Sequence, residues 1–308
     1  MLQFAVGVAL LAALVGFLGP DWGDVRRRLD VDPRWFAASL LATSASATFG
    51  ALRWRLLNEH LMATRLPLTT YFHYMAVTRL VGQFSSMLLM DLVGRGIGLR
   101  TAGAKQGLGQ LLTPVLLERV ADVLFPCFTL AWAVWWRFSD EPRVSWMLSL
   151  ALALVVAASV IVFLIRPAAR VVLWGYGRLL QWRGRTFDRP RVVVPRALAA
   201  KVTLLGLGRY VAVLAQFTGI AFAVGAVRDA AVMAVAFPVS QLSAILAITP
   251  GGLGVQDVGW AGALAWQAVD DTSIAMFLLA AHAGIIINFG LLTLVSLPFG
   301  GRRPSETA

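Results

Sequence analysis

Three charged residues lie within about one helical turn of each other, in a stretch that is otherwise apolar enough for a membrane interior. Glu118, Arg119 and Asp122 fall inside the segment 111–136. A charged side chain in hydrocarbon costs at least about 2.5–3.5 kcal/mol on insertion scales, so it is normally paired or faces a cavity. Glu118 and Asp122 are four residues apart and share a helix face, whereas Arg119 projects about 100° away. Two carboxylates on one face need a cation between them, and four arginines are candidates: Arg79, Arg95, Arg100 and Arg209.

These charges allow two interpretations. In the first, the arginines receive a lipid phosphate or another anionic headgroup, because the guanidinium fork binds phosphate bidentately. In the second, the ion pairs fix broken helices to the rest of a helical bundle. The two interpretations are compatible, and the spacing favours neither.

A helix-breaking run ending in a carboxylate is the second candidate site. It contains a proline, three glycines and an aspartate: Pro250, Gly251, Gly252, Gly254 and Asp257. No charged residue occurs between 230 and 256, so the run belongs at membrane depth, where irregular backbone survives only against protein or a wet cavity. The stretch 258–269 after it is too short to cross a bilayer. We therefore predict a re-entrant hairpin with its glycine turn near mid-depth.

For the turn itself we predict a backbone conformation and the position of a bound anion. A positive φ is expected at Gly251 or Gly252, since a turn of this kind uses the left-handed region. Helix N-termini favour anions, so a phosphate is expected just ahead of Val255, with Arg119 or Arg209 closing over it.

The first half of the chain holds a similar interruption. The apolar segment 68–90 contains Arg79 and Gly82 and runs into the glycine-rich stretch 94–98. Two interrupted segments in corresponding halves indicate an inverted repeat with a substrate site at the repeat interface. Such a repeat would divide the single membrane domain, 1–308, into halves 1–143 and 144–308.

The residue patterns of metal sites and of common catalytic sites do not occur in the sequence. His60, His73 and His282 have no metal-ligand spacing, and there is no Ser-His-Asp arrangement or phosphate-binding glycine loop with a lysine. Asp30 and Asp32 match the Asp-x-Asp of nucleotide-sugar transferases but lie in a short loop. We therefore expect no metal, no cofactor and no enzyme activity from this chain alone.

The composition sets the fold class. The 308 residues are 58% hydrophobic and 14% charged, against about 45–50% and 25% in soluble domains, and the mean hydropathy is +0.74. We predict an all-α polytopic membrane protein with about six to eight transmembrane helices and two broken hairpins. The apolar segments are 2–18, 35–52, 68–90, 111–136, 144–165, 202–227, 230–269 and 272–299.

The net charge is +11. The basic residues lie mostly in the segment 166–201 and at the ends of the spans, which is typical of cytoplasmic loops rather than of nucleic-acid binding. We predict that 166–201 is a basic, partly amphipathic cytoplasmic loop, in which Pro167 opens a surface helix. We expect several passes through the membrane, with Met1 inside.

The motifs resemble those of a known family. The run from Pro250 to Asp257 is similar to the Pro-Gly-Gly-x-Gly-x-(Arg)-Glu run of the flippase-like family that includes the transmembrane domain of lysylphosphatidylglycerol synthases. Glu118-Arg119 followed by Asp122 resembles that family's Glu-Arg-x-x-Asp. Arg53-Trp54 and Arg100 also fit.

Three positions depart from the family pattern. Ile97 follows Gly96 where the family usually has glutamate, Asp257 replaces glutamate, and Gln256 replaces a common basic residue. The headgroup specificity of other members is therefore not carried over to this chain.

The resemblance implies a multi-pass, lipid-handling protein of the cell inner membrane that moves a lipid or lipid-linked headgroup between leaflets. Its expected partners are membrane lipids; an oligomer or a partner protein of envelope biosynthesis stays open. The alternatives are a membrane-embedded transferase acting on a lipid-linked donor, and a non-transporting subunit of an envelope-biosynthesis enzyme. Under the transport hypothesis, headgroups pass the breaks at 94–98 and 251–254. The headgroup-binding residues are then Arg79, Arg100, Glu118, Arg119, Asp122, Arg209, Pro250, Gly251, Gly252, Gly254 and Asp257.

Overall fold

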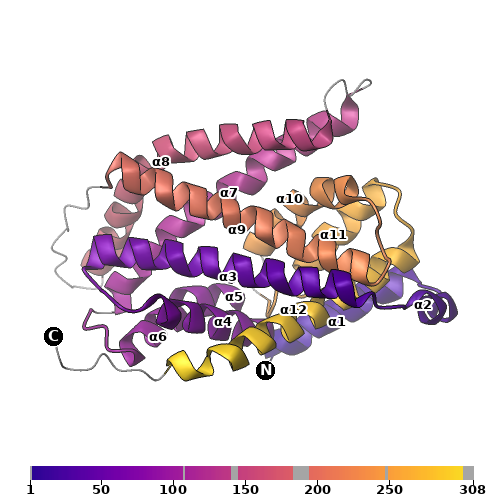
Figure 1. Ribbon diagram of the computed structural model, residues 1–308, viewed down its shortest axis with the longest axis horizontal. Coiled ribbons are helices and arrows are strands. Elements are labelled where there is room, and N and C mark those ends of the chain that lie inside the picture. The colour runs from indigo at the N-terminus through magenta and orange to yellow at the C-terminus, as the bar shows by residue number, and fades with distance from the viewer. Residues whose placement is uncertain (1, 107, 140–144, 183–193, 247–248, 301–308) are drawn as a thin grey trace.

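The computed structural model describes residues 2–106, 108–139, 145–182, 194–246 and 249–300 (Figure 1). These ranges are helical and contain no strand. The elements in chain order are α1 (Leu2–Leu18), α2 (Trp22–Arg28), α3 (Pro33–Met62), α4 (Leu68–Phe84), α5 (Met87–Leu89), the π-helix η1 (Met90–Gly94), α6 (Arg95–Thr101), α7 (Leu108–Phe138), α8 (Trp146–Trp182), α9 (Arg196–Ala223), α10 (Ala230–Leu246), α11 (Val255–Trp266) and α12 (Asp271–Gly300).

Four of these helices are long and apolar enough to cross a membrane. They are α3, α9, α12 and the part of α8 up to Val171. A fifth span results if α1 and α2, which are bent by 97° at their junction, count together. The all-helical, multi-pass class predicted from composition is thereby confirmed. The expected six to eight spans also counted the segments of α4, α7 and the α10–α11 pair. These elements are not among the described helices that meet this length and hydropathy.

The centre of the fold is the packing of α3 against α9. Small residues let the two backbones approach, as is usual between helices in membranes. A Cβ on Gly219 would lie 3.0 Å from the backbone nitrogen of Ser39, and one on Gly206 would lie 3.0 Å from Nη1 of Arg53. The second contact brings α9 directly against a buried arginine, so the central helix pair also positions charge.

The first broken hairpin is formed by α4 and the helices that follow its break. The chain leaves helical geometry at Ser85 and Ser86 and then returns along α4 through α5, η1 and α6. A Cβ on Gly98 would lie 2.5 Å from Cδ1 of Tyr74, and one on Gly94 would lie 3.2 Å from Cγ2 of Thr78. The glycine-rich stretch 94–98 is therefore helical and serves close packing. The break lies before Met87, not at these glycines as the sequence suggested.

The second broken hairpin is α10, the turn that contains Gly251–Gly254, and α11. Its existence and its glycine turn are as predicted, although α11 begins at Val255 and ends at Trp266. The φ angles of Gly251, Gly252 and Gly254 are 60°, 77° and 83°, so three residues of the turn use the left-handed region, where one was expected. Trp260 on α11 packs edge-to-face on Phe277 of α12 with ring centroids 4.9 Å apart, which fixes the hairpin to the bundle.

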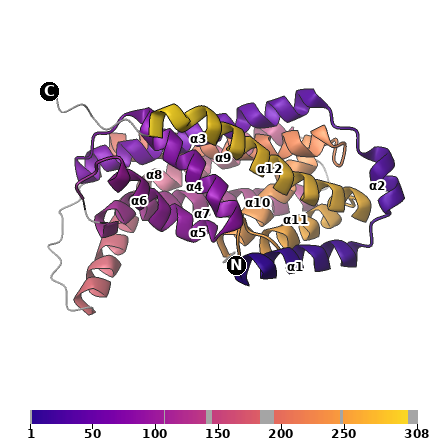
Figure 2. The same cartoon turned by 90° about the horizontal axis from the view of Figure 1, so that it is seen from below.

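The tips of the two hairpins touch. The Gly251 nitrogen donates a hydrogen bond of 2.8 Å to the carbonyl oxygen of Gly82, and Ser86 and Pro250 form an isolated antiparallel bridge. In Figures 1 and 2, α4–α6 and α10–α11 lie toward opposite ends of the long helices. The hairpins therefore approach from opposite sides and supply backbone partners to each other's breaks, which membrane-depth backbone requires.

The helix α8 departs from the prediction for 166–201. It continues without interruption through Pro167 to Trp182, so most of the expected loop before residue 183 extends a transmembrane helix, and residues 183–193 lie outside the described part. Proline is tolerated inside membrane helices because neighbouring groups satisfy the carbonyl that it leaves free. The C-terminal part of α8 projects from the bundle (Figure 2).

Candidate functional site

A network of eight charged residues occupies the middle of the bundle. Five arginines and three carboxylates come from six different elements: Arg53 (α3), Arg79 (α4), Asp91 (η1), Arg95 (α6), Glu118, Arg119 and Asp122 (α7), and Arg209 (α9). Asp91 and Arg95 are one helical turn apart, and so are Glu118 and Asp122, which is why short stretches of chain place them on common faces.

The cation between Glu118 and Asp122 is Arg53. Its Nη2 lies 3.4 Å from Oε2 of Glu118 and 2.9 Å from Oδ1 of Asp122. The sequence analysis offered other arginines for this role. Arg95 reaches the same Oε2 of Glu118 at 2.8 Å, and Arg209 reaches Oδ2 of Asp122 at 2.9 Å. Arg53 and Arg95 have side chains that are 0% and 1% exposed, so both are buried inside the network.

Asp91 is the ion-pair partner of three arginines. Its Oδ1 accepts a hydrogen bond of 2.9 Å from Arg95, and its Oδ2 lies 3.2 Å from Nη2 of Arg79 and forms an ion pair with Arg119. A buried carboxylate facing three guanidinium groups is strongly held in its charged form by Coulomb attraction. The first hairpin is therefore attached to α7 by two ion pairs, Asp91 with Arg119 and Arg95 with Glu118.

The charges in this network do not balance. Five arginines face three carboxylates, which leaves two positive charges among the network's described members. Burial divides the arginines into two sets: Arg53 and Arg95 are sealed, whereas Arg79, Arg119 and Arg209 have side chains that are 17%, 26% and 14% exposed. An anion from outside the network can therefore contact the excess positive charge at three arginines.

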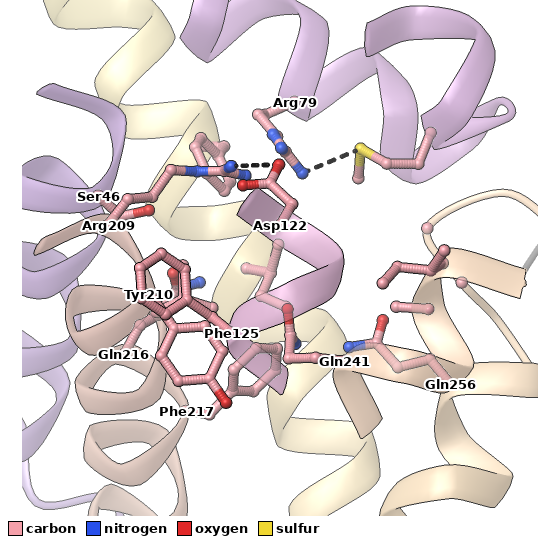
Figure 3. Close-up of a pocket in the computed structure, with 18 of the residues that line it drawn as sticks. Ser46, Arg79, Asp122, Phe125, Arg209, Tyr210, Gln216, Phe217, Gln241 and Gln256 are labelled. Carbon is pink, nitrogen blue, oxygen red and sulfur yellow. Dashed lines mark hydrogen bonds and ion pairs between the residues drawn. The ribbon is translucent and has the colours of Figure 1, made fainter. Parts of the chain in front are cut away.

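These three arginines line one cavity of about 160 Å³ with both polar and apolar walls, shown in Figure 3. At its upper edge in that view Arg209 pairs with Asp122, and Arg79 lies beside them with a contact to the sulfur of Met87; Phe125, Tyr210 and Phe217 form an aromatic wall below. Four glutamines complete the polar lining: Gln83, Gln216, Gln241 and Gln256. Guanidinium and amide groups are donors with planar, directional N–H bonds, so the cavity offers converging donors to an anionic group.

Two glycines of the second hairpin also face this cavity. Gly251 and Gly252 are among its lining residues. A Cβ on Gly251 would lie 2.8 Å from Oε1 of Gln83, and one on Gly252 would lie 2.7 Å from Oε1 of Gln256. The glycines therefore leave space for cavity amides and bring the tip of the second hairpin to the arginines of the first.

The other hairpin residues proposed from sequence lie elsewhere. Pro250 is in the bridge with Ser86, Gly254 packs against Leu10 of α1, and none of Pro250, Gly254 and Asp257 lines the cavity. Asp257 accepts a 2.8 Å hydrogen bond from the Gly254 nitrogen through Oδ2, and its Oδ1 lies 2.8 Å from Nε2 of His282.

This arrangement bears on the anion site expected ahead of Val255. The carboxylate of Asp257 itself occupies the N-terminus of α11, where it satisfies a backbone donor and complements the helix dipole. A phosphate at that position would meet a negative charge, so the structure brings donors for an anion together at the arginines and not at this helix end.

Arg100 is likewise not brought to the site. It is exposed in the last turn of α6 and does not line the cavity. The sequence reasoning missed Asp91 altogether and did not place Arg53 or Arg95 at the headgroup site. The signal was available, since Asp91 and Arg95 are opposite charges four residues apart next to an apolar segment.

No group of three or more histidines, cysteines, aspartates and glutamates able to hold a metal ion occurs among the described residues. The family described as the lysylphosphatidylglycerol synthase TM region matches residues 2–295.

The chain belongs to this family. The match covers both broken hairpins and the whole charged network, so the resemblance inferred from the Pro-Gly-Gly and Glu-Arg-x-x-Asp runs is confirmed. No curated protein matches the chain. Membership supports a multi-pass membrane protein related to lipid handling.

Proposed function

We propose that this protein translocates a lipid with an anionic headgroup, or a lipid-linked anionic group, between the two leaflets of the cell inner membrane. The observation that carries the proposal is the set of three accessible arginines, Arg79, Arg119 and Arg209, around one cavity at the contact of two broken hairpins. The role is transport rather than catalysis, and its partners are membrane lipids.

Charge supports an anionic substrate. Burying a guanidinium group without compensation is costly, and an excess of two positive charges is stabilised by an anion that enters the cavity. The guanidinium fork also matches the geometry of phosphate. The carboxylates hold the arginines in place and leave donors of the three accessible ones directed at the cavity.

The hairpins support translocation rather than static binding. Binding sites formed by broken helices near the bilayer midplane are typical of transporters with alternating access. Here the tips are connected by the Gly251–Gly82 hydrogen bond and the Ser86–Pro250 bridge, which are few contacts compared with those along a packed helix. The second hairpin can therefore separate from the first while Arg119 and Arg209 stay on α7 and α9 and the first hairpin, with Arg79, stays ion-paired to α7.

A translocation assay tests the proposal. Purified protein is placed in liposomes that contain headgroup-labelled phosphatidylglycerol or phosphatidylcholine, and the label on the outer leaflet is quenched chemically. The wild type is expected to exchange phosphatidylglycerol between leaflets, and Arg209→Gln is expected to slow this exchange at least about tenfold, since a charge-assisted hydrogen bond contributes about 1.5–3 kcal/mol.

Arg34→Gln is the matched control. Arg34 is exposed at the start of α3, and its replacement is expected to leave the rate unchanged. Absence of exchange in the wild type with every labelled lipid would contradict transport and favour a subunit or transferase role.

A further inference from the structure

A second hollow lies between α7 and α8 on the outside of the bundle. We name it the α7–α8 groove; its walls are Leu116, Arg119 and Val123 on α7, and Leu164, Ala168 and Val171 on α8, with their immediate neighbours. The groove has a volume of about 530 Å³, within the range of small-molecule sites. Both sets follow the helical spacing i, i+3 or i+4, i+7, so two continuous helix faces form it.

The groove is apolar along its length and charged at a single residue, Arg119. Leu164 and Val171 are 41% and 66% exposed, so the α8 wall faces outward, where a membrane-spanning helix meets lipid. Four residues of each helix line the groove, over the stretches 116–124 and 164–171, which corresponds to roughly 10–12 Å along the helix axes. An extended hydrocarbon chain is the ligand shape that fits an outward-facing apolar channel of this length.

Arg119 connects the groove to the central cavity. Among the described residues it is the one that lines both hollows. Its Nη2 forms the ion pair with Asp91, while Nη1 lies 4.0 Å from Asp122, too far for a hydrogen bond. A guanidinium group has five N–H donors, so Arg119 keeps donors for an additional acceptor while its ion pair with Asp91 is intact.

We propose that the α7–α8 groove binds an acyl chain of an anionic phospholipid whose phosphate contacts Arg119, so that the lipid reaches the central cavity through the side of the bundle. This inference rests on the proposed function and adds the entry route and the lipid chain as part of the substrate. Charge complementarity at Arg119 and the continuity of groove and cavity through that residue identify the occupant.

Photo-crosslinking tests the groove. Phosphatidylglycerol and phosphatidylcholine that carry a diazirine in one acyl chain are each incorporated with the intact protein in liposomes, and the labelled peptides are identified by mass spectrometry. Phosphatidylglycerol is expected to label the groove segments 116–124 and 164–171 at least about tenfold more than phosphatidylcholine, as one charge-assisted hydrogen bond implies.

Leu164→Trp fills the groove without removing a charge, and Leu152→Trp is its matched control. Leu152 is an exposed leucine on the same helix, twelve residues away and outside the groove. Labelling by phosphatidylglycerol is expected to fall at least fivefold in Leu164→Trp and to stay unchanged in Leu152→Trp; Arg119→Gln is expected to remove the preference for phosphatidylglycerol. Equal labelling by both lipids, or full labelling of Leu164→Trp, would show bulk-lipid contact only and overturn the inference.

The two proposals fail separately. If the wild type does not exchange lipid but phosphatidylglycerol labels the groove with the predicted dependence on Leu164 and Arg119, then the groove binds lipid and the transport proposal is wrong. If exchange occurs and Arg209→Gln slows it, while labelling is spread evenly over the exposed helices, then the transport proposal stands and the entry route is wrong.

Discussion

The two broken hairpins are attached to the helical bundle by different interactions. Both place an irregular turn beside the central cavity, and both pack their arms through glycines, Gly94 and Gly98 in one and Gly259 in the other. The first hairpin carries Arg79, Asp91 and Arg95 and joins the bundle through ion pairs. The second has Asp257 as the charged residue of its arms and joins the bundle through aromatic packing.

The difference indicates a division of roles. The charged hairpin, α4–α6, is attached to the arginine network, so its position is set by buried charges that need their partners. The apolar hairpin, α10–α11, contributes backbone and small residues at the cavity, and its contact through a charged residue to the bundle, Asp257 with His282, lies outside the arginine network. We therefore expect substitutions in the first hairpin to act on stability and substitutions at the tip of the second to act on transport.

The largest effect is expected for Asp91→Asn in the first hairpin. Asp91 is fully buried and faces Arg79, Arg95 and Arg119, and removal of one partner from a buried charge network costs about 3–5 kcal/mol. The yield of folded protein and the unfolding midpoint in detergent should both fall sharply. A variant with wild-type stability would show that the network does not hold the first hairpin.

A smaller effect on stability and a large one on transport are expected for Gly251→Ala. The residue has φ of 60°, where a side chain costs roughly 1–2 kcal/mol, and the methyl group would displace Gln83 at the contact of the two hairpins. Thermal unfolding and lipid exchange should be measured separately. Loss of exchange beyond the loss of folded protein supports a role of this tip in transport, while unchanged exchange would remove the tip from the mechanism.

Asp257→Asn compares the acidic residue of the second hairpin with Asp91. Asparagine still caps the helix but removes the carboxylate from the 2.8 Å hydrogen bond with His282, so the cost is expected near 1 kcal/mol, as for helix caps. The unfolding midpoint should shift only slightly compared with Asp91→Asn. An equal loss in the two variants would contradict the different roles given to the two hairpins.

Gly262→Ala is the reference substitution within the second hairpin. Gly262 is helical, and a Cβ there would meet no atom within 4 Å. Replacing a helical glycine with alanine is expected to stabilise the helix by about 0.5–1 kcal/mol. The variant should keep wild-type lipid exchange and raise the unfolding midpoint slightly; reduced exchange would mean that any change in α11 disturbs transport, and would weaken the interpretation of Gly251→Ala.

The sequence predicted the parts of the site that rest on short-range rules. Pro250 and the glycines after it gave the second hairpin, because the effects of proline and glycine on a helix are local. Glu118, Arg119, Asp122 and Arg209 were placed in a shared site because a charge at membrane depth needs a partner.

The parts that it missed depend on packing between distant segments. Gly94, Gly96 and Gly98 looked like a break, but they are helical glycines that allow α6 to approach α4, and a spacing alone does not distinguish the two uses. Arg53 lies between Glu118 and Asp122 only because α3 packs on α9 at Gly206. The helix start at Val255 was expected, but the role of Asp257 as a cap was not, because it depends on the turn that brings the Gly254 nitrogen to the Asp257 carboxylate.

Native mass spectrometry of the mildly purified protein tests the central claim most directly, namely that the accessible arginines hold an anionic headgroup. The wild type is predicted to retain an anionic phospholipid, Arg209→Gln to lose most of it, and Arg34→Gln to retain it. Retention of zwitterionic lipid alone by the wild type, or full retention of the anionic lipid by a folded Arg209→Gln variant, would contradict the account.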